Sequence, residues 1–204
     1  MSPIYLLSKQ AMDRTLAVIA LLIFAPAFVV VALLVKSTSP GPVLFRQERL
    51  GLDGRRITVF KFRTMVVDAE ERLRREGLWA RYVEAGFKLP SDEDCRITRF
   101  GRFLRRASLD ELPQFLSVLR GDMSLVGPRP IVPEELACYG KLAPCYLGVR
   151  PGITGLWQVS GRSTIVFPER ADIDAEYYAR RSMGTDLVIL ARTPIVVLRA
   201  TGAH

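Results

Sequence analysis

The sequence predicts a mostly helical α/β fold with a short β-hairpin, in a monotopic membrane protein whose N-terminal helix enters the membrane and returns. Three observations lead to this fold class. An uncharged run from Leu16 to Val35 contains a proline near its middle, Asp53-Gly54 separates two segments typical of strands, and several charged or amphipathic segments follow. We therefore expect a membrane segment with its flank over residues 1–39. A second domain, with interfacial amphipathic helices, is expected over residues 40–204.

The uncharged run predicts a membrane-associated helix. Its 20 residues match the roughly 20 that span the hydrocarbon core of a bilayer. Pro26 removes a backbone hydrogen bond and clashes with the preceding turn, so a bend is expected there. Basic residues flank the run on both sides, and the positive-inside rule therefore gives it no orientation. A re-entrant helix that breaks at Pro26 keeps both flanks on one side, and we favour it over a tilted span or a buried core helix.

The remaining chain predicts a hairpin followed by helices. The Asp-Gly pair at residues 53–54 is a strong hairpin signal between two alternating segments. Gly121 is typical of a residue that ends a helix, and Pro168 of one that opens it. The expected helices cover residues 68–84, 97–106, 110–119, 168–181 and 186–199. The last of these is apolar and too short to span a membrane, so we expect it in the core or at the membrane interface.

Composition limits the kind of chemistry available. The net charge of +8 favours anionic partners, which are phosphorylated ligands, anionic lipid headgroups or nucleic acid. The three cysteines, Cys95, Cys138 and Cys145, have neither zinc-binding nor redox spacing and are interpreted as free thiols. The single histidine is His204, at the terminus. A histidine-based catalytic triad is therefore excluded, and any acid, base or nucleophile is Asp, Glu, Lys, Tyr, Ser or Cys.

The stretch RRASLDELPQ, residues 105–114, has two interpretations. Ser108 and Glu111 have the spacing of a capping box, and acidic residues favour a helix N-terminus. Alternatively, Asp110 and Glu111 stay ionised beside arginines at a positively polarised helix start. They would then bind a divalent cation or attack phosphorus. Pro113 weakens the first interpretation, because it would lie too deep in a helix that begins at Ser108.

Basic side chains recur on short, stiff loops. GPRP holds one arginine between two prolines, and an arginine fork is suited to phosphate. VRPGITG, WQVSGR and KFRTM add further basic and polar residues. Together these loops predict a pyrophosphate ligand, although the sequence has no Walker loop and no dinucleotide-binding glycine motif. The residues concerned are Lys61, Arg63, Arg129, Arg150, Gln158 and Arg162.

The chain resembles the small monotopic phosphoglycosyl transferases, bacterial sugar transferases that load a sugar phosphate onto a polyprenyl phosphate. The resemblance runs in order through AMDRTLAVIALLIFAPAF, GPVLFRQERLG, KFRTM, CRITRFGRFLRRASLDELPQ, GDMSLVGPRP and VRPGITGLWQVSGR. It covers nearly the whole chain and implies the minimal catalytic form. One departure is Ala25, because the family usually has serine before the proline of its broken helix. The break would then rest on Pro26 alone.

The resemblance implies a reaction and roles for individual residues. A UDP-sugar would give its sugar 1-phosphate to undecaprenyl phosphate and release UMP, by a ping-pong mechanism through a covalent phosphosugar on Asp110. Glu111 would assist, and Mg²⁺ bound by Asp110 and Glu111 would offset the charge of the pyrophosphate. Arg105 and Arg129 would hold phosphate. Weaker assignments as nucleotide, sugar or lipid-phosphate contacts are Lys61, Arg63, Arg150, Gln158 and Arg162.

The resemblance also implies a location and partners. The catalytic domain would lie on the cytoplasmic face of the bacterial inner membrane, in contact with membrane lipid, and its product would pass to downstream glycosyltransferases of polysaccharide or glycoconjugate synthesis. Apolar helix faces are compatible with a homodimer, and no nucleic-acid partner is expected. Two other classes compete with this hypothesis. One is a membrane-anchored protein that binds nucleic acid or anionic lipid, and the other is a metal-dependent phosphohydrolase that uses water as acceptor.

Overall fold

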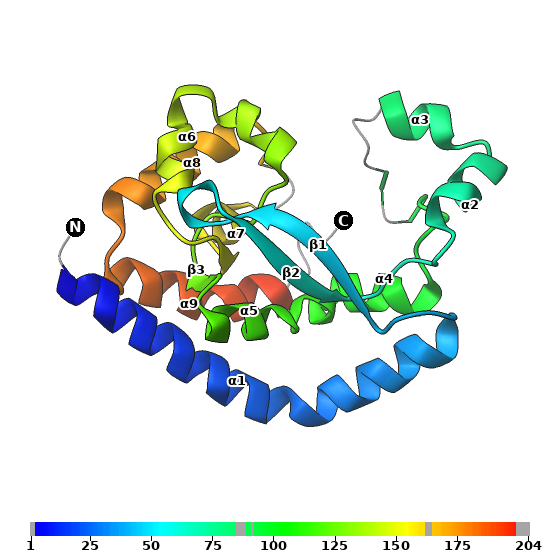
Figure 1. Ribbon diagram of the computed structural model, residues 1–204, viewed down its shortest axis with the longest axis horizontal. Coiled ribbons are helices and arrows are strands. Elements are labelled where there is room, and N and C mark those ends of the chain that lie inside the picture. Colours follow the sequence, from blue (N-terminus) through cyan, green and yellow to red (C-terminus); the bar gives the residue numbers. More distant parts are fainter. Residues whose placement is uncertain (1–2, 85–88, 91, 162–164, 199–204) are drawn as a thin grey trace.

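The computed structural model describes residues 3–84, 89–90, 92–161 and 165–198, and it is mostly helical, as predicted (Figure 1). The elements follow in the order α1 (Pro3–Thr38), β1 (Leu44–Leu50), η1 (Leu52–Gly54), β2 (Arg56–Phe62), α2 (Ala69–Arg75), α3 (Trp79–Glu84), α4 (Arg99–Arg106), η2 (Leu109–Glu111), α5 (Gln114–Arg120), β3 (Ser124–Val126), η3 (Pro133–Leu142), α6 (Ala143–Leu147), β4 (Gly152–Thr154), α7 (Leu156–Ser160), α8 (Glu169–Arg180) and α9 (Met183–Leu198).

Helix α1 runs along one side of the molecule and bends in its middle, the part that contains Pro26 (Figure 1). The helix ends at Thr38, and the membrane segment with its flank was expected to end at residue 39. The expected break at Pro26 is wrong as secondary structure, because the helix continues through the proline. A proline removes one hydrogen bond and its ring displaces the preceding turn, and a bend accommodates both effects without ending the helix. Within the described ranges, α1 is the one helix long and apolar enough to cross a membrane.

The hairpin is confirmed. Strands β1 and β2 pair antiparallel from Leu44 opposite Phe62 to Leu50 opposite Arg56. Asp53 and Gly54 both have positive φ, at 56° and 75°, as the tight connection requires. The hairpin carries the KFRTM segment at the end of β2 toward the middle of the molecule.

A second, two-stranded sheet joins the two loops that contain Arg-Pro. Strand β3 pairs parallel with β4, with Ser124 opposite Gly152 and Val126 opposite Thr154. Gly127 allows this approach, because a Cβ at that position would lie 2.3 Å from the Arg150 carbonyl oxygen. The GPRP loop therefore leaves the sheet in a fixed direction.

Several predicted helices are shorter than expected. The charged helix over residues 68–84 divides into α2 and α3, with Gly77 at φ 70° between them. The helix expected from residue 110 is a 3₁₀ turn, η2, followed by α5 from Gln114. Gly121 ends α5 with φ 83°, as predicted.

The three cysteines are free thiols, also as predicted.

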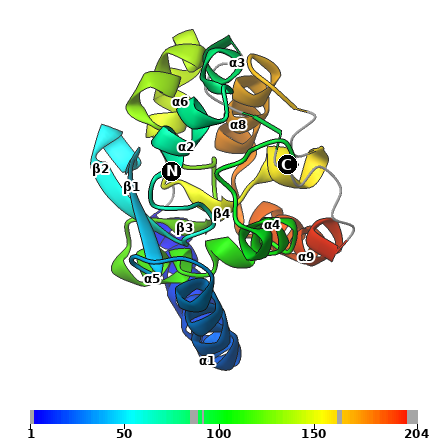
Figure 2. The ribbon, with the colours of Figure 1, turned by 90° about the vertical axis from the view of Figure 1, so that its right-hand side faces the viewer.

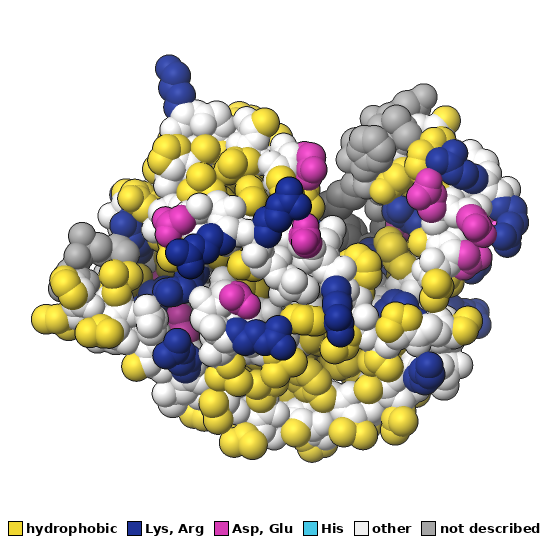
Figure 3. Space-filling model, viewed as in Figure 1, with side chains coloured by type: hydrophobic (Ala, Val, Ile, Leu, Met, Phe, Trp, Pro, Cys, Tyr) yellow, Lys and Arg dark blue, Asp and Glu magenta, His cyan; other side chains and the backbone are white. Residues whose placement is uncertain are grey.

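Helix α1 contributes to two of the three hydrophobic clusters. Ala17 packs with β2, α5 and α9, and Val31 and Val35 pack with Phe62 and Leu104. The opposite face of α1 is apolar and exposed, and it forms the hydrophobic lower edge of the molecule in Figure 3. Helix α9 buries Asp186 and Ile189 and exposes apolar side chains such as Leu187 and Leu198. Figures 1 and 2 both show α1 and α8 on opposite sides of the molecule.

Candidate active site

A cleft of about 840 Å³ lies between the end of β2, the η2 turn, the GPRP loop and helices α7 and α8. The space-filling view shows a hollow between the part that carries α6 and α8 and the part that carries α2 and α3 (Figure 3). Asp110 and Glu111 line the cleft together with Lys61, Arg105 and Arg129. Five residues predicted from three separate segments of the sequence are thereby brought together.

The η2 turn presents the two acids. Ser108 precedes it with φ 55° and ψ 20°, a left-handed conformation that is uncommon for a residue other than glycine. Its side chain does not cap the turn, so the predicted capping box of Ser108 and Glu111 is wrong. The reason is that the Glu111 carboxylate is held by cations of the cleft instead of reaching back to the backbone.

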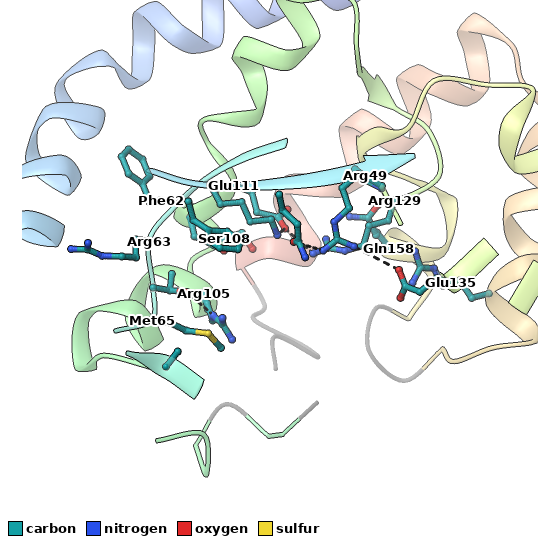
Figure 4. Close-up of a pocket in the computed structure, with 18 of the residues that line it drawn as sticks. Arg49, Phe62, Arg63, Met65, Arg105, Ser108, Glu111, Arg129, Glu135 and Gln158 are labelled. Carbon is teal, nitrogen blue, oxygen red and sulfur yellow. Dashed lines mark hydrogen bonds and ion pairs between the residues drawn. The ribbon is translucent and has the colours of Figure 1, made fainter. Parts of the chain in front are cut away.

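Glu111 bridges two basic residues from different elements. Its Oε1 accepts a hydrogen bond from Lys61 Nζ at 2.7 Å and another from Arg129 Nη2 at 2.9 Å (Figure 4). Burial alone would raise the pKa of Glu111, but the charges of Arg129 and Lys61 outweigh it and hold the pKa well below its usual range. Glu111 therefore stays ionised and fixes both cations beside the cleft.

Asp110 lies next to this cluster with a different electrostatic character. Its side chain is buried, with 8% of the residue exposed. Burial and the charge of Glu111 raise the pKa of Asp110 to about 6, against the opposing effect of Lys61, Arg105 and Arg129. The interpretation that both carboxylates stay ionised beside arginines remains a prediction: the low pKa of Glu111 agrees with it, and the raised pKa of Asp110 still leaves that acid mostly ionised at pH 7. The helix-start and arginine effects do not compensate for burial beside a second carboxylate.

Arg105 reaches the cleft from α4. Its Nε donates to Thr64 Oγ1 at 3.0 Å, beyond the end of β2. This approach requires Gly101, because a Cβ there would lie 2.1 Å from the Thr64 carbonyl oxygen. The charge of Arg105 acts on the pKa of Asp110, so its guanidinium is within electrostatic reach of the carboxylate.

The other predicted residues divide by location. Gln158 lines the cleft, and its Nε2 donates to the Ile153 carbonyl oxygen at 3.0 Å. Arg63 lines the cleft but its guanidinium turns toward the end of α1, where Nη2 donates to the Ser39 carbonyl oxygen at 2.6 Å (Figure 4). Arg150 is not brought into the cleft, because its Nε donates to the Gly121 carbonyl oxygen at 2.9 Å. Arg162 lies outside the described residues.

Residues 4–200 match the family described as bacterial sugar transferase. The chain belongs to the bacterial sugar transferase family.

Similar proteins come from several bacteria. The exopolysaccharide production proteins ExoY of Sinorhizobium fredii and Rhizobium meliloti are 39% and 38% identical, over 99% of this chain and 90% of each relative. The undecaprenyl-phosphate galactose phosphotransferase of Salmonella typhimurium is 40% identical over 96% of this chain, and the match spans 41% of that protein. The UDP-glucose:undecaprenyl-phosphate glucose-1-phosphate transferase of Xanthomonas campestris is 41% identical over 98% of this chain and 40% of its own length.

The sugar transferase cleft also contains residues that the sequence did not point to. Arg49 from β1 pairs with Glu135 of η3 at 3.6 Å, and Trp157 and Arg170 line the same side. The hairpin register could have indicated Arg49, because Phe45 lies opposite Lys61 and Arg49, four positions further along β1, belongs to the same face. Arg170 lies in a charged helix that gave no local signal.

Two carboxylates of the cleft could hold Mg²⁺ together with a phosphorylated ligand. No group of three His, Cys, Asp or Glu side chains suited to a metal occurs among the described residues. Mg²⁺ commonly takes one or two carboxylates and completes its coordination with water and substrate phosphates. Asp110 and its neighbour Glu111 provide such a pair, although Glu111 Oε1 already accepts two hydrogen bonds. The site therefore suits a cation that arrives with, or is completed by, a phosphorylated ligand.

Proposed function

We propose that this sugar transferase moves a sugar 1-phosphate from a UDP-sugar to undecaprenyl phosphate, as the first membrane step of polysaccharide or glycoconjugate synthesis. Relatives named for galactose and glucose 1-phosphate transfer to undecaprenyl phosphate support this substrate class. The cleft supports it independently, because its cations and carboxylates suit a diphosphate.

The observation that carries the proposal is the division of tasks between the two adjacent acids. Glu111 accepts the hydrogen bonds of Lys61 and Arg129, whereas the neighbouring Asp110 makes neither contact. An acid that is fully engaged by cations is a poor nucleophile, and a buried acid with a raised pKa is a stronger one. Asp110 is accordingly proposed as the nucleophile, and Glu111 as the residue that positions the phosphate-binding cations.

Two displacements at one phosphorus atom account for the products. The Asp110 carboxylate attacks the phosphorus attached to the sugar, a bond from its oxygen forms, and the bond to the bridging oxygen breaks to release UMP. The phosphate oxygen of undecaprenyl phosphate then attacks the same phosphorus and releases the carboxylate. Neither step needs a general base, provided that Asp110 is ionised, as it mostly is at pH 7 with a pKa of about 6. Lys61, Arg105 and Arg129 would stabilise the charge on the transferred phosphoryl group.

Mg²⁺ is part of the proposal, and Asp110 and Glu111 are the residues that would hold it. When bound, it supplies positive charge that offsets the charge of the pyrophosphate.

Contacts near both ends of α1 support a placement of the protein on one face of the membrane. Near its start, Asp13 accepts hydrogen bonds from Ser124 and Leu125, and near its end Val35 packs in the core with Phe62. A helix that crossed the bilayer would separate these two ends. The exposed apolar face between them would contact lipid, and the apolar side chains of α9 would lie at the interface. We propose that this face is the cytoplasmic face of the inner membrane.

The test is UMP release from a panel of UDP-sugars with undecaprenyl phosphate and Mg²⁺. The wild type should release UMP from at least one sugar nucleotide and form the sugar-diphosphate lipid. Asp110→Asn should lose at least about 1,000-fold of this activity, while Asp172→Asn, an exposed acid on α8, should match the wild type. Retained turnover in Asp110→Asn would remove Asp110 as nucleophile. Release of free sugar 1-phosphate without lipid would favour a phosphohydrolase instead.

A further inference from the structure

Arg170 is a cation of the cleft to which the reaction above gives no task. It is the second residue of α8 and lines the cleft together with Arg49, Trp157 and Gln158. The central carbon of its guanidinium lies 4.6 Å from the centroid of the Trp157 ring and 5.0 Å from that of Phe167. Two aromatic rings therefore hold this side chain in place by cation–π contact.

The polar atoms of this wall are buried and lack partners. Nε and Nη2 of Arg170 make no hydrogen bond with any residue in the described part of the chain, and the same holds for Trp157 Nε1 and Gln158 Oε1. A buried donor without an acceptor is costly, and most such groups in native proteins have a partner. Contact with aromatic rings leaves guanidinium N–H groups available to a ligand that offers acceptor oxygens.

The charges around Arg170 favour an anion. Burial lowers the pKa of Arg49, Glu135 opposes this, and the charges of Arg129 and Arg170 lower it further. Three guanidinium groups thus lie within electrostatic reach along one side of the cleft. Glu111 is shared between Arg129 and Lys61, and Glu135 lies 3.6 Å from Arg49. Asp174, one turn along α8, accepts a hydrogen bond from Tyr139 Oη and is within electrostatic reach of Arg170, so this acid is shared between the two residues.

The residues that line the cleft lie on two sides of Glu111. Arg49, Arg129, Gln158 and Glu135 gather on one side of Glu111, and Arg105 and Met65 lie on the other (Figure 4). The charge of Arg129 acts on both Asp110 and Arg49, so Arg129 is within electrostatic reach of Asp110 and of this wall. Helix α8, which carries Arg170, is on the side of the molecule opposite α1 (Figures 1 and 2). A water-soluble nucleotide can approach there, whereas a lipid phosphate would approach from the side of α1.

We propose that Arg170 binds the nucleotide phosphate of the donor, and the phosphate of the UMP product, at this wall of the cleft. The inference rests on the proposed function and deepens it. Lys61, Arg105 and Arg129 surround the phosphate that reacts with Asp110, and Arg170 takes the neighbouring phosphate that departs. A guanidinium at this place stabilises the charge that develops on the leaving group.

The experiment compares UMP and uridine, which differ by the phosphate, as ligands of two proteins. Calorimetric affinities are measured for the wild type and Arg170→Gln in the same detergent. The wild type should bind UMP more tightly than uridine. Arg170→Gln should weaken UMP binding about 10- to 100-fold, the range expected for a hydrogen bond to a charged group, and leave uridine binding unchanged. Arg180→Gln, an exposed arginine of the same helix, is the matched control and should bind UMP as the wild type does.

Other binding results would overturn the assignment. Equal weakening of UMP and uridine would mean that Arg170 shapes the pocket without touching phosphate. Unchanged UMP binding, together with a raised KM for undecaprenyl phosphate, would assign Arg170 to the acceptor phosphate. If Arg170→Gln does not fold, Arg170→Lys provides the test, because it keeps the charge and loses the planar fork. It should bind UMP more weakly than the wild type, and wild-type affinity would contradict the proposal. Failure of the wild type itself to bind UMP would count against the proposed function as well.

Discussion

Two clusters of buried charge lie in different parts of the molecule. They differ in whether all of their polar atoms have partners. In the first, which we call the α1 anchor, Lys9 lies 2.8 Å from Asp186, and Tyr177 donates to the same carboxylate at 2.8 Å. Asp13 accepts from Ser124 Oγ at 2.7 Å and from the Leu125 N–H at 3.2 Å. In the second, the cleft around Asp110 and Glu111, several buried donors and one acceptor have no partner among the described residues.

The difference separates structure from function. Both clusters contain buried acids and bases, so burial of charge does not by itself mark an active site. The α1 anchor is satisfied internally, and it ties a mostly apolar helix to β3, α8 and α9. The cleft has more cations than its own carboxylates engage, and an anionic ligand would satisfy buried donors of the cleft that lack partners among the described residues. Substitutions in the anchor should therefore reduce stability, whereas substitutions in the cleft should reduce activity.

The largest effect is expected for Asp13→Ala in the α1 anchor. It removes the acceptor of Ser124 and Leu125 and leaves Lys9 with one acid fewer. Each buried donor that loses its acceptor costs about 1–3 kcal/mol, and Lys9 keeps its contact with Asp186. Thermal unfolding in detergent should show a clear fall in Tm, with kcat of the folded fraction near that of the wild type. Asp172→Ala, an exposed acid, is the control, and an equal Tm for the two variants would contradict the structural role of the anchor.

Arg129→Ala should affect activity nearly as strongly. It removes a cation that contacts Glu111 and acts on Asp110, while Lys61 still pairs with Glu111. Loss of one group that stabilises transition-state charge costs about 100- to 1,000-fold in kcat. The rate of UMP release measures this loss, and the Tm should change little. Full activity of the variant would place Arg129 outside the catalytic machinery.

Glu111→Gln should change the pH dependence of kcat/KM. In the wild type kcat/KM should fall as the pH drops below about 6, because protonated Asp110 is not nucleophilic. Removing the charge of Glu111 removes one cause of the raised pKa and frees Lys61 and Arg129 to favour the ionised form of Asp110. The acidic limb should therefore move to lower pH, and the plateau should fall because the two cations lose their anchor. An unchanged limb would mean that a different group controls it.

Arg150→Ala should have the smallest effect. Arg150 donates to the Gly121 carbonyl oxygen at the end of α5 and has no place in the cleft. A hydrogen bond from a charged group to the backbone contributes about 1.5–3 kcal/mol. The bond of Arg150 is partly exposed and contributes less. The Tm should fall slightly and KM for the donor should stay within about twofold of the wild type. A large rise in KM would restore Arg150 as a substrate contact.

Local patterns predicted much of this fold. Asp53-Gly54 indicated the hairpin because both residues tolerate positive φ, and Gly121 indicated the end of α5 for the same reason. The charge-free run indicated α1, because a long apolar segment without charge favours one long helix. Of the basic residues on the predicted loops, Lys61 and Arg129 meet at the cleft, and Arg105, which the resemblance indicated, joins them.

Long-range contacts were beyond such patterns. Ser108 and Glu111 had capping-box spacing, but a lysine 50 positions earlier in the sequence takes the glutamate. Asp13 appeared as a flank of a membrane segment, and its partner Ser124 lies 111 positions away. Arg150 and Arg129 share an Arg-Pro form, yet β3 and β4 direct the first to a helix end and the second to the cleft. Arg170 shows its role only beside Trp157 and Phe167.

The central claim is that Asp110 carries the sugar phosphate, and trapping that adduct tests it most directly. The protein is incubated with a UDP-sugar labelled in the sugar, without lipid, then denatured and analysed by intact mass and bound label. We predict label on the wild-type protein, its loss when undecaprenyl phosphate is added before denaturation, and none on Asp110→Asn. Label bound equally to Asp110→Asn, or lipid product formed at full rate without any labelled protein, would contradict the account.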